Sequence, residues 1–278
     1  MVRFLLAVFL ALGFVSTCVE AQTASPKIFV ASTGNDANDG SRASPKRSFQ
    51  AAHDSVGEGG EIVVLDTAGY GAVRIFKTVS IVAPPGVSAF VTVNAGNVGI
   101  GVGAYGLVVL RGLIVEGAGS ADGSIGIRGG GGMLVVEDTI VRNLETGIAS
   151  GTGGLVVRRG AVRNTSTGIS VAGIDTPINA LITDIELTGN TTAITVQNLF
   201  WKDPGQLILV ASRCTITGSS IVFWLNSLYP QVVVDECTIA GNGTVFATSG
   251  DGVFYTRSNN TIYNNTNLGT TPIPLAGR

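Results

Sequence analysis

The side chains that could carry acid–base hydrolysis are spread along the sequence. Such chemistry on a glycosidic bond needs two carboxyl groups that face each other at about 5 to 9.5 Å. The carboxylates within strand-like segments are Asp138, Asp184, Glu186 and Asp235, and their spacing directs no two of them to one point. The only histidine, His53, is expected on the solvent-exposed side of a short helix. The sequence therefore assigns no catalytic residue, and the catalytic positions of any enzyme here stay unknown.

Composition argues against a metal site and against nucleic acid. The 278-residue chain has only 19 Asp and Glu residues, spread along its length, and it contains no D-x-D-x-D-G calcium loop. A net charge of -2 lacks the basic footprint that nucleic acid favours. With 45% hydrophobic residues, the chain can form a sizeable core. We predict no metal, no cofactor and no nucleic-acid partner.

Two arginines are candidates for an anion site. Arg142 and Arg163 occupy equivalent positions in neighbouring repeats, and Glu116 occupies that position one repeat earlier. Because stacked like charges repel, the pair could await an anionic ligand such as a uronate. The weak energetics of surface charges favour the alternative, an exposed pair that Asp138 and Glu116 neutralise.

Aromatic residues suggest a carbohydrate contact in and beyond the longest predicted loop, at 198–204. Trp201 lies in this loop, and Trp224, expected to point outward, and Tyr229 follow it. The flat apolar face of a tryptophan suits contact with a sugar ring. The alternative, which we favour, is that the loop folds back and Trp201 packs on the side of the solenoid.

Two cysteines occupy one position in adjacent repeats. Cys214 and Cys237 would lie directly above each other, which in an exported chain suggests a disulfide. Stacked parallel neighbours are not an easy geometry for that bond. Two buried thiols packed as small apolar groups are the alternative, and both interpretations stay open.

A repeated pattern would position all of these side chains. Each repeat has an apolar run, a charged residue, a pair such as Thr-Ile, and often an Asn. The apolar pivots are separated by 26, 21, 26, 29, 23 and 23 residues: Ile114, Ile140, Ala161, Leu187, Ile216, Ile239 and Ile262. The segments are short, rich in Val, Ile and Thr, and bounded by Gly or Asn, which is typical of strands. Several short strands in each repeat of about 23 residues predict an all-β fold, a right-handed parallel β-helix of about nine coils.

Two ladders of side chains follow from this stacking, because stacked strands lie about 4.8 Å apart. Three residues after the pivots come Gly117, Asn143, Asn164, Asn190, Ser219, Asn242 and Asn265. Such Asn side chains can bond backbone and neighbouring amides, so we interpret them as structural. Three residues before the pivots the charge alternates through Arg111, Glu137, Arg158, Asp184, Arg213 and Glu236, ending at Asn259. Stacked opposite charges attract, which supports the register.

The N-terminus has the form of a secretory signal. Arg3 precedes an apolar run over residues 4–15, and Val19-Glu20-Ala21 suits cleavage after residue 21. The run is short for a bilayer span. An alternative makes Cys18 a lipidated first residue. We expect a secreted, periplasmic or cell-surface protein without a membrane span in the mature chain.

The remaining chain divides into three segments. They are an N-terminal cap at 22–60, the β-helix at 61–265 and a capping tail at 266–278, after the signal at 1–21. In the cap, a short helix that opens at Ser44-Pro45 is expected to bury Phe49, Ala52 and Val56 and to cover the edge of the first coil. The tail is polar and contains two prolines, which suits a segment that cannot extend the sheet.

Parts of the N-terminal sequence resemble a known superfamily. The chain reads IFVASTGND at 28–36 and FQAA at 49–52. Together these two segments resemble the N-terminal cap of secreted right-handed β-helix proteins of the pectin-lyase-like superfamily. The first coil of a mostly uncharacterised group of these proteins is similar to GGEIVVLD, GYGAV and KTVSI within 59–81. The resemblance covers about residues 27–265. The rival solenoid, the leucine-rich repeat, requires a Leu spacing that is missing here.

The resemblance implies the fold but no single activity, because the superfamily includes lyases, hydrolases, epimerases, adhesins and phage tailspikes. The Gly-His-Gly and Arg-x-Lys motifs of polygalacturonase-type hydrolases are absent from the sequence. The first hypothesis is therefore a non-catalytic exported β-helix that presents a surface for adhesion or glycan contact. The second is a polysaccharide lyase or glycoside hydrolase with an unrecognised site. A polysaccharide is the partner that both hypotheses suggest.

Overall fold

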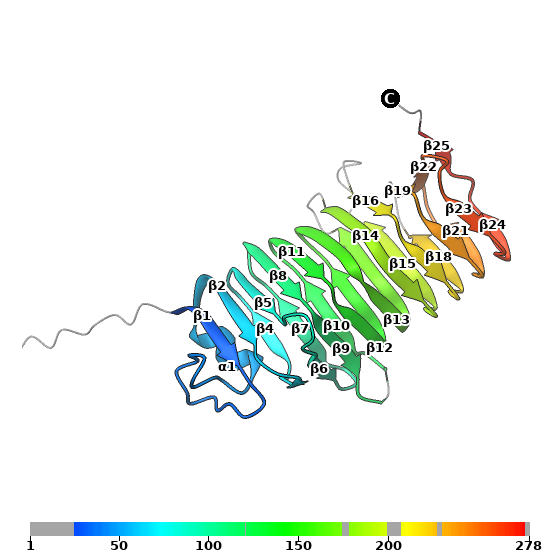
Figure 1. The fold of residues 1–278 in the computed structure, drawn as a ribbon. Coiled ribbons are helices and arrows are strands. Elements are labelled where there is room, and N and C mark those ends of the chain that lie inside the picture. Colours follow the sequence, from blue (N-terminus) through cyan, green and yellow to red (C-terminus); the bar gives the residue numbers. More distant parts are fainter. Residues whose placement is uncertain (1–24, 120, 174–177, 199–206, 227–229, 276–278) are drawn as a thin grey trace, which may run out of the picture.

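Short segments rich in Val and Ile form three parallel strands in each turn of a β-solenoid (Figure 1). This is a computed structural model, and it describes residues 25–119, 121–173, 178–198, 207–226 and 230–275. Of the described residues, 60% lie in strands and 3% in a helix, and the solenoid has about eight turns. The predicted all-β, right-handed parallel β-helix is confirmed, close to the nine coils expected.

The strands stack into three faces, and every pairing is parallel. The first face holds β1 (Ser25–Val30), β2 (Val56–Val64), β5 (Val79–Val82), β8 (Leu107–Arg111), β11 (Met133–Glu137), β16 (Leu207–Ser212), β19 (Gln231–Asp235), β22 (Val253–Thr256) and β25 (Ile273–Pro274). The second holds β3 (Ala68–Gly69), β6 (Ala89–Val93), β9 (Leu113–Gly117), β17 (Thr215–Thr217), β20 (Thr238–Ala240) and β23 (Thr261–Tyr263). The third holds β4 (Val73–Ile75), β7 (Val98–Val102), β10 (Ile125–Gly129), β15 (Thr192–Asn198), β18 (Ile221–Leu225), β21 (Thr244–Thr248) and β24 (Asn267–Gly269). Three longer strands turn corners and so serve more than one face: β12 (Ile140–Ser150), β13 (Gly154–Gly173) and β14 (Ile178–Thr188).

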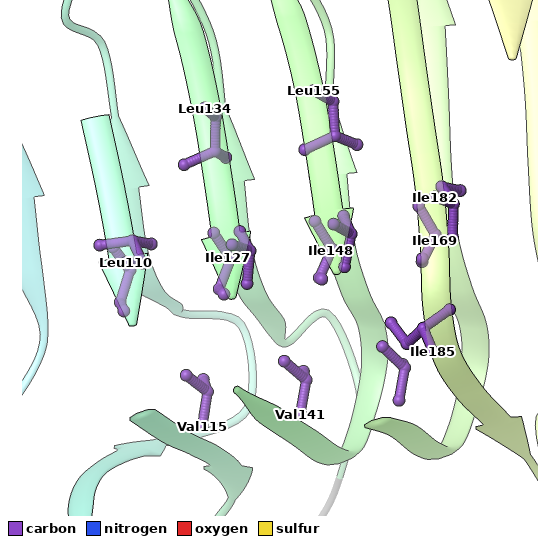
Figure 2. Close-up of a cluster of buried hydrophobic side chains, with 14 of the residues drawn as sticks. Leu110, Val115, Ile127, Leu134, Val141, Ile148, Leu155, Ile169, Ile182 and Ile185 are labelled. Atoms are coloured by element: carbon purple, nitrogen blue, oxygen red, sulfur yellow. The ribbon is translucent and has the colours of Figure 1, made fainter. Parts of the chain in front are cut away.

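Apolar side chains point inward at alternate positions and form columns through the core. Leu134 pairs with Leu155 on the first face, and Val115 pairs with Val141 on the second. Figure 2 shows these side chains directed into the space between the faces. Because stacked strands place like residues in register, each turn covers the apolar surface of the turn before it.

The predicted register holds for the first coils and shifts by one residue at β14. Ala161 pairs with Glu186, where the repeat predicted Leu187. The inward column of the second face is Val115, Val141, Val162, Leu187, Ile216, Ile239 and Ile262. A shift of one residue exchanges the inward and outward sides of a strand, so the seven predicted pivots belong to two columns.

The predicted charge ladder therefore breaks at one step, between Arg158 and Asp184, whereas its later steps hold: Arg213 contacts Asp184 at 2.7 Å and Glu236 at 4.0 Å. Arg158 does bind Glu137, at 2.5 Å, but its partner in the next coil is Thr183. Asp184 belongs to the corner between the first and second faces, where one residue in each coil adopts a positive φ: Gly112, Asp138, Arg159, Asp184, Arg213 and Glu236. The charges form two groups, one centred on Glu137 and one along this corner.

The Asn residues likewise occupy two positions. Asn143 and Asn164 adopt positive φ values of 58° and 53° at the corner between the second and third faces. Asn242 and Asn265 lie one position later: the Asn265 Oδ1 accepts hydrogen bonds from the backbone N–H and the side-chain amide of Asn242, both at 2.9 Å. A single seven-rung column does not form, because the corner residue is Gly189, Gly218 and Gly241 in the coils between Asn164 and Asn264.

The helix α1 (Phe49–Ser55) lies against β1, β2 and β4 at the N-terminal end of the stack (Figure 1). It begins after Ser48, whose side chain caps it, rather than at the Ser-Pro pair predicted to open it. The prediction of an exposed His53 is wrong. This side chain is 4% exposed, and its Nε2 accepts a hydrogen bond from the Phe76 N–H at 3.3 Å.

The C-terminal segment differs from its prediction. Residues from 266 onward add β24 and β25, which pair with β21 and β22. The expectation of a tail that cannot extend the sheet is therefore wrong. A proline is tolerated in β25 because this edge strand has no following strand that needs a backbone N–H donor. No helix in the described part of the chain is long and apolar enough to cross a bilayer, and the predicted signal lies outside that part.

Candidate functional site

A groove of about 720 Å³ lies on the third face near the N-terminal end. Its walls come from β4, β7 and β10, from the end of β6 and the loop that follows it, and from α1. The groove exists because side chains are missing from its floor. Gly101 occupies an outward position of β7 where the neighbouring coils carry Arg74 and Arg128, and Gly103, just after β7, lies beside Phe76.

Two arginines stand on either side of Gly101. Arg74 on β4 and Arg128 on β10 both pair in register with this glycine. Both side chains are exposed, because they alternate with the buried Ile75 and Ile127. Within the described part of the chain, neither guanidinium has a carboxylate within 4.0 Å or a hydrogen-bond partner. The groove thus carries two unneutralised positive charges.

Amide, hydroxyl and aromatic groups complete the lining. Thr92, Asn94 and Asn97 are exposed along one edge. Gln50 of α1 is held in place, since its Oε1 accepts the Arg74 backbone N–H at 2.9 Å. Phe76 lies beside Gly103 with 69% of its surface exposed. A few polar groups around an apolar ring are the composition of a site that binds a sugar.

Comparison with known proteins identifies the fold. No protein-family model matches the sequence, and no curated protein does. The structure of pectate lyase Pel9A matches with a TM-score of 0.62 at 13% identity, over 90% of this chain and 81% of that one. The complex of XylC with xylose matches with a TM-score of 0.62 at 9% identity, over 82% of this chain. This chain spans only 65% of XylC.

The fold is that of the pectin-lyase-like parallel β-helix. At such low identities the likeness is one of backbone architecture, and residue roles do not transfer. The site in this chain must therefore be judged on its own side chains.

The predicted anion pair is neutralised. Arg142 and Arg163 do stack in register on the second face. However, Arg142 binds Glu116 at 2.6 Å and Arg163 binds Glu186 at 2.6 Å. These contacts agree with the alternative of an exposed arginine pair that carboxylates neutralise. Of the two carboxylates expected to do so, Glu116 does, whereas Asp138 binds Arg159.

Of the three aromatic residues predicted to contact carbohydrate, only Trp224 lies in the described part of the chain. Trp201 and Tyr229 lie outside the described residues. Trp224 is half-buried on β18, in register with Thr195 and Ala247 on the same column that begins at Arg74. Thr195 is 3% exposed, so the open part of this column ends before it reaches Trp224. The proposed sugar contact at the three aromatic residues stays a prediction.

The candidate acids are engaged in ion pairs or hydrogen bonds. Asp138 binds Arg159 at 3.0 Å, and Asp184 binds Arg213 at 2.7 Å. The hydrogen bond from Arg213 holds the pKa of the Asp184 carboxyl below its usual value. The Asp235 carboxylate accepts the side-chain amide of a neighbouring Asn at 2.9 Å. Among the described residues, no three His, Cys, Asp or Glu side chains gather as a metal site would require.

The two cysteines lie where the repeat predicted. Cys214 and Cys237 are buried free thiols, and the Cys237 Sγ accepts the Cys214 N–H at 3.4 Å. The hydrogen bond between the thiols and their burial raise the pKa of Cys214. The arrangement is that of packed thiols, and the disulfide stays a prediction that thiol titration of the unfolded, unreduced protein would test.

The groove residues escaped the sequence analysis. Arg74, Gly101 and Arg128 are 27 residues apart in each step, so their spacing could have placed them in one column. The repeat was traced from the segments of the first and second faces, which contain the conspicuous charges. The third face is rich in Gly in its early coils, and a missing side chain leaves no motif in a sequence.

Proposed function

We propose that this protein is a carbohydrate-binding β-helix that holds a polysaccharide in the groove of its third face without cleaving it. The observation that carries the proposal is the groove's lining. It combines the exposed ring of Phe76, several amide and hydroxyl groups, and a floor made flat by Gly101 and Gly103. Such a lining offers both stacking and hydrogen bonding to a sugar.

The same lining supports binding over catalysis. Hydrolysis requires a pair of carboxyl groups, and the described lining contains no Asp, Glu or His. Elimination requires a base, and a guanidinium such as Arg74 or Arg128 remains protonated in proteins. A polysaccharide lyase or glycoside hydrolase therefore remains the second hypothesis. The N-terminal signal-like sequence adds to the proposal that the protein acts outside the cell.

Calorimetric titration with a panel of soluble polysaccharides tests the proposal. We expect the wild-type protein to bind at least one polymer, and Phe76→Ala to weaken that binding about tenfold, because the ring supplies apolar contact. Tyr263→Ala is the matched control, since this ring is also exposed, at 58%, but lies at the far end of the solenoid. Absence of binding to every polymer would refute the proposal.

The same mixtures distinguish binding from turnover. After prolonged incubation, we expect no ultraviolet-absorbing unsaturated product and no new reducing ends. Accumulation of the first product would indicate a lyase, and accumulation of the second a hydrolase. Either result would establish the alternative and move the search for a base or acid pair beyond the groove described here.

A further inference from the structure

Building on the proposed function, we infer that Arg74 and Arg128 form a two-point anion site over Gly101. The site would select polysaccharides that carry carboxylate or sulfate groups. The bound chain would run along the solenoid axis, and no metal ion would be needed between it and the protein.

The first support is the state of these two arginines. Six arginines elsewhere on the solenoid reach carboxylates at 2.5 to 3.0 Å, among them Arg111, Arg142 and Arg213, and a seventh, Arg257, reaches Asp235 at 3.9 Å. Arg74 and Arg128 lack any such partner among the described residues. A guanidinium binds carboxylate and sulfate oxygens through two parallel N–H donors, so each is available for one anionic group.

The second support is their alignment. Arg74, Gly101 and Arg128 occupy one outward column, so the two arginines are separated by two strand spacings, or about 9.6 Å. A side chain at the middle position would separate the two cations. Glycine leaves that position open, and a built Cβ there would meet nothing nearer than 3.9 Å. One ligand chain can therefore reach both guanidinium groups along the axis.

The third support is the continuation of this column. Beyond Arg128 the next coils place Ala149 and Ser170 at the same position. These small residues leave the surface low, until the buried Thr195 ends the open part. A polymer that is anchored at the two arginines thus has room to extend toward the middle of the solenoid.

The lining also indicates direct contact between anion and arginine. Sites that bind an anionic polymer through a metal ion need protein carboxylates to hold the metal. The described lining of this groove supplies none. Binding is therefore expected to persist in a chelator and to weaken as salt is raised, because the charges are exposed to solvent.

Titration calorimetry in EDTA, with paired polymers, tests the inference. Polygalacturonate and its methyl-esterified form share a backbone and differ in charge, and dextran sulfate and dextran do the same for sulfate. We expect an acidic member to bind at least about tenfold more tightly than its neutral partner. The uronate and sulfate arms show which anion the site prefers.

Two double variants each remove two positive charges, one pair from the groove and one pair from the second face. Arg74→Gln/Arg128→Gln is expected to lose at least about tenfold in affinity for the acidic polymer. Arg142→Gln/Arg163→Gln removes the same charge from the second face and is expected to stay within about twofold. Thermal unfolding of each variant checks that it is folded, and the groove arginines have no described partner to lose.

Each outcome has a separate meaning. Equal losses in both double variants would reduce the effect to net charge and overturn the inference. Equal binding of acidic and neutral polymers, unchanged in Arg74→Gln/Arg128→Gln, would overturn the anion site while leaving the carbohydrate-binding function intact. Absence of binding to any polymer would refute the proposed function itself.

Discussion

Arginines on two parts of this solenoid have opposite surroundings. At the corner between the first and second faces, Arg111, Arg158 and Arg159 converge on Glu137, whose side chain is 2% exposed. In the groove of the third face, Arg74 and Arg128 flank a glycine without a described carboxylate partner. In both places the arginines lie on or next to parallel strands in register, and what separates the two groups is whether a described carboxylate reaches them.

The comparison separates structural charge from available charge. Glu137 joins three successive coils, because its two oxygens accept from arginines of the coil before and the coil after. Charge-assisted hydrogen bonds of this kind stabilise the stacking of one coil on the next. The groove arginines make no such contact with the described residues, and they cost little because solvent and salt screen exposed charges.

The largest expected effect comes from the shared carboxylate. Glu137→Gln removes the negative charge from three guanidinium groups, and we expect the free energy of unfolding to fall by about 2 kcal/mol, since hydrogen bonds between charged groups contribute about 1.5 to 3 kcal/mol. Denaturant titration measures this change. Glu186→Gln is the control, because that carboxylate is 42% exposed, pairs with one arginine, Arg163, and otherwise accepts the Thr188 hydroxyl at 2.8 Å; the change should cost no more than about 0.5 kcal/mol. Equal losses would remove the distinction between the two kinds of pair.

The pH dependence sharpens the same point. Burial alone would raise the pKa of the Glu137 carboxyl, but the hydrogen bonds and charges of Arg158 and Arg111 hold it below 4.5, the unperturbed value. Its folded pKa is therefore lower than its unfolded pKa, so its contribution to stability is complete above pH 4.5 and is lost as pH falls through the folded pKa. The difference in unfolding free energy between wild type and Glu137→Gln should be constant above pH 4.5 and narrow below it. A difference that is independent of pH would show that the charge of Glu137 is not the source of its stabilisation.

A smaller effect compares the arginines directly. Arg111→Gln/Arg158→Gln leaves Glu137 with one cation, and we expect a loss of about 1.5 kcal/mol, a value reduced by the partial exposure of both guanidinium groups. Arg74→Gln/Arg128→Gln should change the free energy of unfolding by less than about 0.5 kcal/mol. Denaturant titration of the two double variants gives both numbers. A similar loss from the groove pair would reveal a structural contact there and weaken its assignment to a ligand.

The fold could be predicted because it depends on features that a sequence displays. Short β-prone segments, separated by Gly or Asn and repeated at about 23 residues, have few other architectures open to them. The register from β14 onward could not be predicted in this way. Ala161 and Leu187 are both apolar, so residue type alone did not reveal that the first points outward and the second inward. The chain direction at the preceding corner decides this, and Asp184 adopts its positive φ there without being Gly or Asn.

The site was harder to predict for a related reason. The sequence analysis selected Arg142 and Arg163 because they stack, but stacking alone does not tell whether a carboxylate from the adjoining strand reaches each of them. Glu186 reaches Arg163 from the next coil only in the shifted register. Conversely, Gly101 matters because of what it lacks. His53 was misplaced because its Nε2 accepts the backbone N–H of Phe76, a partner 23 residues away that the helix pattern does not reveal.

The smallest expected change in stability comes from filling the groove. Gly101→Val adds a side chain at an outward position where the nearest heavy atoms to a built Cβ are Val98 Cγ1 at 3.9 Å and Arg74 Cγ at 4.0 Å. No positive φ restricts the residue, and valine favours a strand, so stability should stay level or rise by about 0.5 kcal/mol. The new side chain would stand between the two cations, and we expect affinity for an acidic polymer to fall about tenfold in calorimetry. Ala247→Val is the control, because it makes a similar change on the same column but beyond the buried Thr195, which ends the open part. If both variants bind as the wild type does, the space over Gly101 does not hold the ligand, and the contrast between the groove and the corner concerns stability alone.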